Sequence, residues 1–498
     1  MVFASPIFLY LFLPAYILLY MFAPNVTGGL RDCRRTGKFS LSAFMPSLRS
    51  QNAMLTLLSL FFYAWGEPVW VVLLLFSSLV DYVVGRVIGI FRGRPQAKIA
   101  LICSIVINLS LLGTFKYLDF FLESLGLLTG VRMPSFGIEL PIGISFYTFQ
   151  TMSYSIDAYK GSVKIQKSFP DFLLFVSLFP QLIAGPILRY SDIEDQLSNR
   201  TVTWELVASG VTRFACGLGK KVLIANIAGE IGTKILDGNL DGLPAADAWV
   251  GILMFTAQIY FDFSGYSDMA IGLGRMFGFD YTENFRYPYM SRSVTDFWRR
   301  WHITLGSFFR DYVYIPLGGN KKRQIFNLFV TWALTGLWHG ASWNFVLWGL
   351  YYFVLLVIEK IIIKPLAGKL GHWWGWLYTF PLVVLGWVLF YFTDMNRLGV
   401  FAGALFGSGG LAGPETSTLW LGNLPLIILC AVAASPVPAI LAKGFIGADA
   451  KPGTGRRLTG ASGNLAGGLT IAFNTIVLAM CTLMLLRQSY NPFLYFRF

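Results

Sequence analysis

His339 is the side chain best suited to chemistry in this sequence, because it lies inside an apolar run of membrane length. Residues 331–350 read TWALTGLWHGASWNFVLWGL and contain no charged residue. An ionisable side chain at membrane depth is costly and usually marks a site, and imidazole transfers protons near neutral pH. We therefore predict that His339 is catalytic. The structural alternative is that its ring only bonds a carbonyl of a neighbouring helix.

His302 lies in the one conspicuous polar block, residues 286–323, which reads RYPYMSRSVTDFWRRWHITLGSFFRDYVYIPLGGNKKR. A helix that only anchors to lipid has no need of an imidazole beside two arginines. His302 is therefore a second candidate catalytic residue, with a structural hydrogen bond as the alternative. Four apolar residues of the block recur at i, i+3, i+7 and i+10, a spacing that predicts one face of an interfacial helix: Trp298, Trp301, Leu305 and Phe308.

Basic side chains of the same block could bind the phosphates of an acyl donor in a cytoplasmic recess. Arginine and lysine suit phosphate for geometric and Coulombic reasons. The alternative is that these residues extend to anionic lipid headgroups. The candidates are Arg299, Arg300, Arg310, Lys321 and Lys322.

Two carboxylates, Asp262 and Asp268, interrupt the run QIYFDFSGYSDMAIGLGRMFG at residues 258–278. Either could orient a histidine or line a tunnel, and either could pair with arginines of the basic block. We favour an ion pair for Asp268 and leave the role of Asp262 open. The third histidine, His372, precedes a cluster of tryptophans and reads as part of an aromatic belt at the membrane surface.

The composition predicts an all-α polytopic membrane protein. Only 13% of the residues are charged, against about 25% in soluble domains, and the mean hydropathy is +0.60. Apolar runs recur along the whole chain. We expect about 11 or 12 spans, with short runs such as 53–65, 141–156 and 171–188 re-entrant or tilted. Residues 1–498 are expected to form a single integral-membrane domain, with the histidine-bearing core at about 141–359.

The net charge of +13 indicates cytoplasmic loops and contact with anionic lipid, not nucleic-acid binding. The loops 29–49, 86–98, 286–323 and 443–457 are basic and should be cytoplasmic, whereas the acidic segment 228–247 should lie on the opposite side. The five cysteines are scattered without a CxxC pair. They predict neither a disulfide framework nor a metal site.

The sequence resembles the membrane-bound O-acyltransferase (MBOAT) family, and within it the bacterial alginate O-acetyltransferase branch, over nearly its full length. After GWVLF the branch often has arginine, whereas this chain has Tyr391. The matching segments include MVFASPIFLYLFLP, FFYAWGEPVWVVLLLFSSLVDY, PIGISFYTFQTMSYSIDAYKG, FPQLIAGPILRY, FDFSGYSDMAIGLGRMFGF, TDFWRRWHITLGSFFRDYVYIPLGGN, GLWHGASWNFVLWGLYY and the terminal YNPFLYFRF.

The resemblance implies a ring of transmembrane helices with re-entrant and interfacial helices around a central tunnel. It implies that the family's two histidines are His302 and His339, the latter catalytic. It further implies an enzyme of the bacterial inner membrane that binds no cofactor and moves acetyl from a cytoplasmic thioester, acetyl-CoA, toward exported alginate. Periplasmic acetyltransferase or polysaccharide-modifying proteins would be the partners.

Other functions remain open from the sequence. The acceptor could be cellulose, peptidoglycan or another exopolysaccharide, while D-alanyl transfer to teichoic acid matches less well. A transporter or flippase would also have broken helices and buried polar groups. A scaffold within an export complex is the third alternative.

Overall fold

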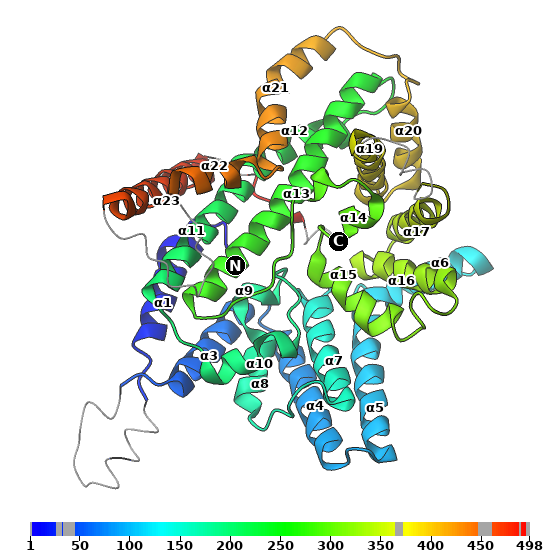
Figure 1. Cartoon of the computed structure of the whole chain (residues 1–498). Coiled ribbons are helices and arrows are strands. Elements are labelled where there is room, and N and C mark those ends of the chain that lie inside the picture. The colour runs from blue at the N-terminus through cyan, green and yellow to red at the C-terminus, as the bar shows by residue number, and fades with distance from the viewer. Residues whose placement is uncertain are drawn as a thin grey trace. The chain divides into compact units, whose positions relative to one another are not determined.

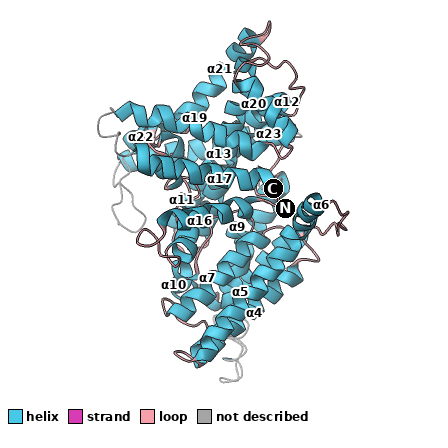
Figure 2. Cartoon of the chain, turned by 90° about the vertical axis from the view of Figure 1, so that its right-hand side faces the viewer, coloured by secondary structure: helices cyan, strands magenta, loops and turns pink. Residues whose placement is uncertain are grey.

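The computed structural model describes residues 2–25, 32, 45–363, 372–446, 461–487 and 490–494, and every regular element in these ranges is a helix (Figures 1 and 2). The loops 29–49 and 443–457, expected to be cytoplasmic, lie largely outside the described residues. Six helices are long and apolar enough to cross a membrane, which confirms an all-α, multi-pass membrane protein. They are Val71–Ile90, Pro95–Thr129, Trp343–Ile363, Trp373–Tyr391, Thr416–Ala433 and Gly467–Arg487.

Several apolar runs that contribute to the expected 11 or 12 spans fold as shorter or more polar helices. The run 171–188 breaks into α8 (Phe169–Ser177) and the single turn α9 (Phe179–Leu182), where Pro180 occupies the first turn. Proline fits there because the first amides of a helix have no intrahelical acceptor. The long helix α13 (Ala245–Met276) has 32 residues but includes three aspartates.

The helices form two compact units, with α11 (Trp204–Gly219) and α13 contributing residues to both. Unit 1 contains residues 1–210 and 270–282, and unit 2 contains residues 211–269 and 283–498. The remaining elements of unit 1 are η1 (Phe8–Phe12), α1 (Leu13–Met21), α3 (Leu48–Gly66), α4 (Val71–Ile90), α5 (Pro95–Leu112), η3 (Gly113–Tyr117), α6 (Leu118–Thr129), α7 (Ile144–Lys160) and α10 (Tyr190–Asn199).

Unit 2 contains both site histidines and the remaining elements. These are η4 (Lys220–Ala225), α12 (Asn226–Leu236), η5 (Pro288–Met290), α14 (Val294–Trp298), α15 (Ile303–Phe309), η6 (Arg310–Tyr314), α16 (Gln324–His339), α17 (Trp343–Ile358), η7 (Glu359–Ile363), α19 (His372–Tyr391), α20 (Met395–Leu405), α21 (Thr416–Ala433), α22 (Val437–Ile446) and α23 (Ala461–Arg487).

Unit 1 is organised around a buried carboxylate, Asp81, where α4, α5 and α7 pack together (Figure 1). One oxygen, Oδ1, accepts hydrogen bonds from Ser104 Oγ at 2.5 Å and Ser155 Oγ at 2.6 Å. The other, Oδ2, accepts from Asn108 Nδ2 at 2.7 Å. A buried carboxylate is tolerated when such donors surround it. The donors come from α5 and α7, so this network joins three helices.

Two glycines allow α16 and α17 to pack at close range in unit 2. A Cβ on Gly336 would lie 2.4 Å from the carbonyl oxygen of Phe345, and one on Gly349 would lie 2.4 Å from that of Trp332. Only glycine permits this approach, as in small-residue packing of membrane helices generally. The two short apolar runs 325–338 and 343–358 predict a helical hairpin with WHGAS at its turn, and α16 and α17 form this hairpin.

The prediction of one interfacial helix in the polar block is wrong. The chain forms α14, leaves the helix at Arg299, and starts again as α15 after His302. His302 has a φ of 44°, a left-handed conformation that cannot continue an α-helix. Trp301 and Leu305 are buried in the protein instead of forming a surface face.

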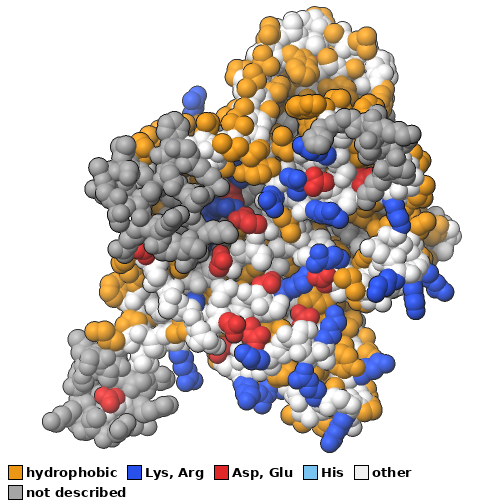
Figure 3. Space-filling view, viewed as in Figure 1, with side chains coloured by type: hydrophobic (Ala, Val, Ile, Leu, Met, Phe, Trp, Pro, Cys, Tyr) orange, Lys and Arg blue, Asp and Glu red, His pale blue; other side chains and the backbone are white. Residues whose placement is uncertain are grey.

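The outer helices of unit 2 present apolar side chains to their surroundings. Only 6% of the most apolar window of α21 is buried within the protein, and the same holds for residues 467–487 of α23. Figure 3 shows hydrophobic side chains covering the surface over α21, a helix that carries no charged residue. Lipid contact accounts for such exposure in a membrane protein.

Candidate active site

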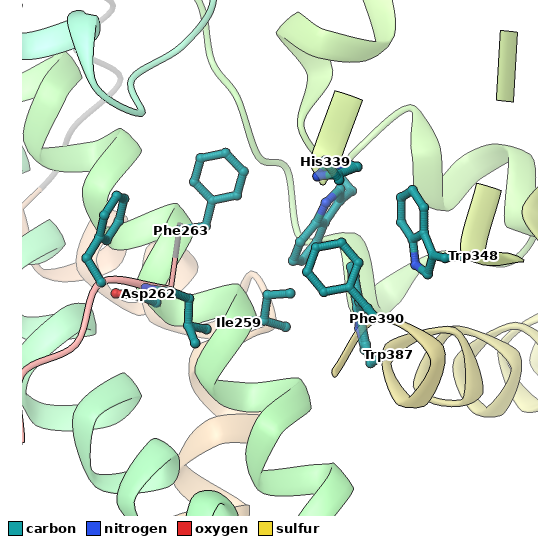
Figure 4. A pocket seen from close by; sticks show the side chains of 10 residues that line it. Ile259, Asp262, Phe263, His339, Trp348, Trp387 and Phe390 are labelled. Atoms are coloured by element: carbon teal, nitrogen blue, oxygen red, sulfur yellow. The ribbon is translucent and has the colours of Figure 1, made fainter. Parts of the chain in front are cut away.

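His339 ends α16 and is buried among aromatic rings (Figure 4). Its ring centroid lies 4.9 Å from that of Trp348 on α17 and 5.3 Å from that of Phe390 on α19, both nearly perpendicular to it. The close α16–α17 contact brings Trp348 to this position. A Cβ on Gly340 would collide with the Phe345 ring, so the turn after His339 also needs its glycine.

A small cavity opens beside His339. Its volume is about 30 Å³, room for roughly two water molecules at ~10–15 Å³ each. Figure 4 shows Ile259, Asp262 and Phe263 of α13 on one side of this space, with His339, Trp348 and Phe390 on the other. Trp301, Trp387, Phe493 and Leu494 complete the lining. This arrangement gives an imidazole a narrow, mostly apolar chamber.

Asp262 forms a buried ion pair that fixes the C-terminal segment 490–494 against this cavity. Lys221 Nζ lies 2.7 Å from Asp262 Oδ1, and the two side chains are 6% and 2% exposed. The backbone amide of Leu494 donates to Asp262 Oδ2 at 2.8 Å, and Lys221 Nζ also donates to the carbonyl of Pro492. Asp262 therefore binds a lysine of η4 and the C-terminal segment, not an arginine of the basic block.

His302 is buried, and the ring of Trp338 contacts both His302 and His339. The Trp338 ring centroid lies 5.8 Å from that of His302 and 5.0 Å from that of His339. His302 Nδ1 lies 3.1 Å from Oδ1 of Asn284. Burial lowers the pKa of His302 from 6.5 to about 3, so its ring is neutral at physiological pH.

Glu359 connects the His339 hairpin to the segment that precedes His302. This buried carboxylate of η7 accepts hydrogen bonds from the backbone amide of Val294 at 2.5 Å and from that of Thr295 at 3.2 Å. Both amides belong to the first turn of α14, where unpaired N–H groups favour an anion. The first residue of η7, directly after α17, thus holds the start of α14.

A second cavity, of about 800 Å³, is lined by several charged side chains. It is lined by α11, α13, the loop after α13, and parts of α21, α22 and α23. Its charged lining residues are Arg213, Lys220, Asp268, Glu283 and Arg286. The volume falls within the usual range for small-molecule sites.

Asp268 forms ion pairs, as we predicted from the sequence. Its partners come from α11 and η4, however, and not from the basic block. Arg213 lies 2.6 Å from one of its oxygens, and Lys220 Nζ lies 2.6 Å from the other. Arg213 also pairs with Glu283 at 2.6 Å. The sequence could not identify these partners, because they lie about 50 residues away along the chain.

The five basic residues proposed for donor phosphates lie outside the residues that line either cavity. Arg300 pairs with Asp296 at 2.9 Å, and Arg310 pairs with Asp311 at 2.6 Å. Arg299, Lys321 and Lys322 are exposed. Their role as phosphate ligands stays a prediction.

Sequence reasoning missed three functional candidates: Asn284, Lys221 and Glu359. Asn284 and Glu359 lie next to polar or charged residues and have no periodic signal of their own. Lys221, 5% exposed, could have been suspected, because a lysine between apolar segments must find an anion if it is buried.

Comparison with known proteins identifies the family of the chain. The family model for "MBOAT, membrane-bound O-acyltransferase family" matches residues 142–399, which include both histidines. The chain belongs to the membrane-bound O-acyltransferase family. It is therefore an acyltransferase.

The chain is also similar, over most or all of its length, to named bacterial proteins. It is 37% identical to "Probable alginate O-acetylase AlgI" of Pseudomonas putida and 37% identical to the protein of the same name from Azotobacter vinelandii, with 100% of each chain covered. It is 34% identical to "Peptidoglycan O-acetyltransferase" of Helicobacter pylori, across 78% of this chain and 77% of the relative.

Removing the charge of Asp262 should destabilise the protein and disturb the cavity. Asp262→Ala leaves Lys221 buried without an anion, a change that typically costs about 3–5 kcal/mol. The thermal unfolding midpoint of the detergent-solubilised protein should fall clearly. In the double variant Lys221→Met with Asp262→Leu, part of that loss should be recovered. A midpoint unchanged in Asp262→Ala would contradict the ion pair.

Proposed function

We propose that this protein is an O-acetyltransferase of the bacterial inner membrane that moves acetyl from cytoplasmic acetyl-CoA toward an exported polysaccharide. Alginate is the favoured acceptor, because full-length relatives at 37% identity are named for alginate O-acetylation. The observation that carries the proposal is His339, held by α16 in a cavity that has room for only a few heavy atoms. A periplasmic acetyltransferase or another polysaccharide-modifying protein would complete the delivery.

The reaction requires a base near the donor carbonyl. His339 removes the proton from an acceptor hydroxyl as that oxygen attacks the thioester carbon. The new C–O bond forms, the C–S bond breaks, and the leaving thiolate takes a proton. An acetyl-histidine intermediate would divide the same exchange into two steps. In either route, the neutral form of the imidazole is the one that can act as base or nucleophile.

The 800 Å³ cavity is our candidate for donor binding. Arg286, Arg213 and Lys220 lie on its lining, and Arg286 begins the basic block that the sequence places on the cytoplasmic side. Phosphates suit such cations. Helix α13 contributes to both cavities, with Tyr260 lining the large one and Ile259 the small one. A donor held in the large cavity would have its thioester arm directed along α13.

Peptidoglycan is a second candidate acceptor, and the Helicobacter pylori relative at 34% identity is the observation that favours it. Comparing the acetyl content of alginate and of peptidoglycan in cells with and without the gene separates the two. Loss of acetyl from alginate alone supports the main proposal. A transporter would leave acetyl transfer by the purified protein undetectable.

His339→Gln should lower acetyl transfer from labelled acetyl-CoA by about 10²–10⁴-fold, the usual contribution of a general base. The assay uses protein in proteoliposomes, so that both membrane faces exist. His372→Gln is the matched control and should retain the parent rate. A folded His339→Gln protein with the parent rate would rule out this role.

Arg286→Gln should raise the KM for acetyl-CoA by roughly tenfold, because a charge-assisted hydrogen bond is worth about 1.5–3 kcal/mol. With the short donor S-acetyl-N-acetylcysteamine, which lacks phosphates, the same variant should behave like the parent. Lys321→Gln provides the comparison. If Lys321→Gln raises the KM for acetyl-CoA and Arg286→Gln does not, the phosphates bind the basic residues that the sequence analysis proposed.

Phe390→Ala should widen the small cavity and relax the preference for acetyl. One additional methylene is typically discriminated by about 10–200-fold, so the kcat/KM ratio of propionyl-CoA to acetyl-CoA should rise by about tenfold or more. Phe401→Ala removes an equally buried ring outside this lining and controls for general destabilisation. An unchanged ratio in Phe390→Ala would mean that this wall does not select the acyl group.

A further inference from the structure

The backbone of His302 is held in a conformation that histidine rarely adopts. Its φ is 44°, and left-handed conformations of such residues cost about 1–3 kcal/mol unless their surroundings enforce them. Here the surroundings are the segment around Asn284. The backbone amide of Ile303 donates to the carbonyl of Asn284 at 2.9 Å, and that of Arg286 donates to the carbonyl of Arg300 at 2.9 Å.

The side chain of Asn284 has only one orientation that satisfies its neighbours. The backbone amide of Thr304, which can only donate, lies 3.3 Å from Oδ1, so the atom facing it must be the oxygen. Thr304 Oγ1 donates to the same oxygen at 2.9 Å. The amide nitrogen Nδ2 donates to Ser267 Oγ at 3.2 Å. Asn284 is itself fully buried.

This orientation determines the tautomer of His302. An amide oxygen can only accept a hydrogen bond, so Nδ1, which lies 3.1 Å from Oδ1, must carry the proton. The other nitrogen, Nε2, then has a lone pair. It is buried and has no hydrogen-bond partner within the described part of the chain. A buried, unsatisfied polar atom costs about 1–3 kcal/mol, a cost that a bound substrate would relieve.

The nearest rings to the His302 imidazole are aromatic and apolar. Phe263 of α13, Phe285 of the preceding loop and Trp338 of α16 surround the ring. Charged side chains on neighbouring segments form several ion pairs: Glu283 and Asp268 with Arg213, Asp268 with Lys220, Asp262 with Lys221, and Arg300 with Asp296. Arg286 and Arg299 lie on the same segments. The other titratable group on α16 is His339, adjacent to Trp338.

We propose that Asn284 is a positioning residue that fixes His302 as the Nδ1–H tautomer and thereby presents a bare Nε2 to an N–H or O–H group of a substrate. This inference rests on the proposed acetyl transfer. In many enzymes a carboxylate orients a histidine in the same way. A neutral amide such as that of Asn284 orients the ring without favouring the protonated imidazolium. The low pKa of His302 agrees with this role, because the ring stays a hydrogen-bond acceptor throughout the physiological range.

Asn284→Asp tests the proposal most sharply. The carboxylate keeps an oxygen facing Thr304 and Nδ1, but its charge beside the ring raises the pKa of His302. Protonation converts Nε2 into a donor, so activity in this variant should fall as the pH falls through the raised pKa. Relative to the parent, we expect the acidic limb of the pH–activity profile to shift upward by roughly 1–3 pH units. Thr304→Val, which loses a bond to the same oxygen, should leave the pH profile unchanged.

Asn284→Leu removes the acceptor altogether and should lower kcat by about tenfold or more at every pH. The same kinetics show which substrate supplies the N–H or O–H group that binds Nε2. A rise in the KM for acetyl-CoA assigns Nε2 to an amide of the donor arm, and a rise in the KM for the acceptor assigns it to the acceptor hydroxyl. If the Asn284→Asp profile coincides with that of the parent, the positioning role is refuted.

A measurement independent of activity separates this inference from the proposed function. The chain has only three histidines, so ¹⁵N-histidine labelling gives few signals, and His302→Gln assigns the one that disappears. A protonated Nδ1 with a bare Nε2 in the parent, changing to a mixture in Asn284→Leu, supports the inference even if the acceptor differs from alginate. An Nε2–H tautomer in the parent overturns it.

Discussion

The position of His339 depends on how closely α16 and α17 can approach. Gly336 and Gly349 face each other's helix, and any side chain at either position would meet a backbone carbonyl. With both helices in contact, Trp348 stands against His339 and Phe390 closes the other side. The chamber around the imidazole is therefore a product of backbone packing, and its aromatic walls follow from that packing.

Polar groups in this apolar interior occur as paired sets that also connect distant segments. Lys221 and Asp262 hold the C-terminal segment beside the His339 cavity. Glu359 holds the first turn of α14. Asn284 holds the left-handed turn at His302. In each case one buried polar side chain satisfies several partners, as burial requires, and each set positions a part of the site.

The sequence predicted the parts of the structure that depend on local pattern. The apolar runs indicated a helical membrane protein, and WHGAS between two such runs predicted the hairpin that carries His339. The polar block was predicted to form one helix from the spacing of its apolar residues, Trp298, Trp301, Leu305 and Phe308. That prediction was wrong, because the backbone amides of Ile303 and Thr304 donate to Asn284 instead of continuing the helix. Partners such as Lys221 for Asp262, or Glu359 for α14, join residues far apart in the chain, which periodicity cannot reveal.

The hydrogen-bonded cluster at Asp81 has a consequence for how the chain enters a bilayer. Asp81 lies on α4, its donors Ser104 and Asn108 arrive with α5, and Ser155 arrives only with α7. Before α5 and α7 have emerged, Asp81 lacks the side-chain donors that surround it in the folded protein, and the membrane interior penalises an ionisable group. Insertion of α4 and α5 as a pair removes most of that penalty. One carboxylate thus makes the entry of α4 and α5 into lipid as a pair more favourable than the entry of α4 alone.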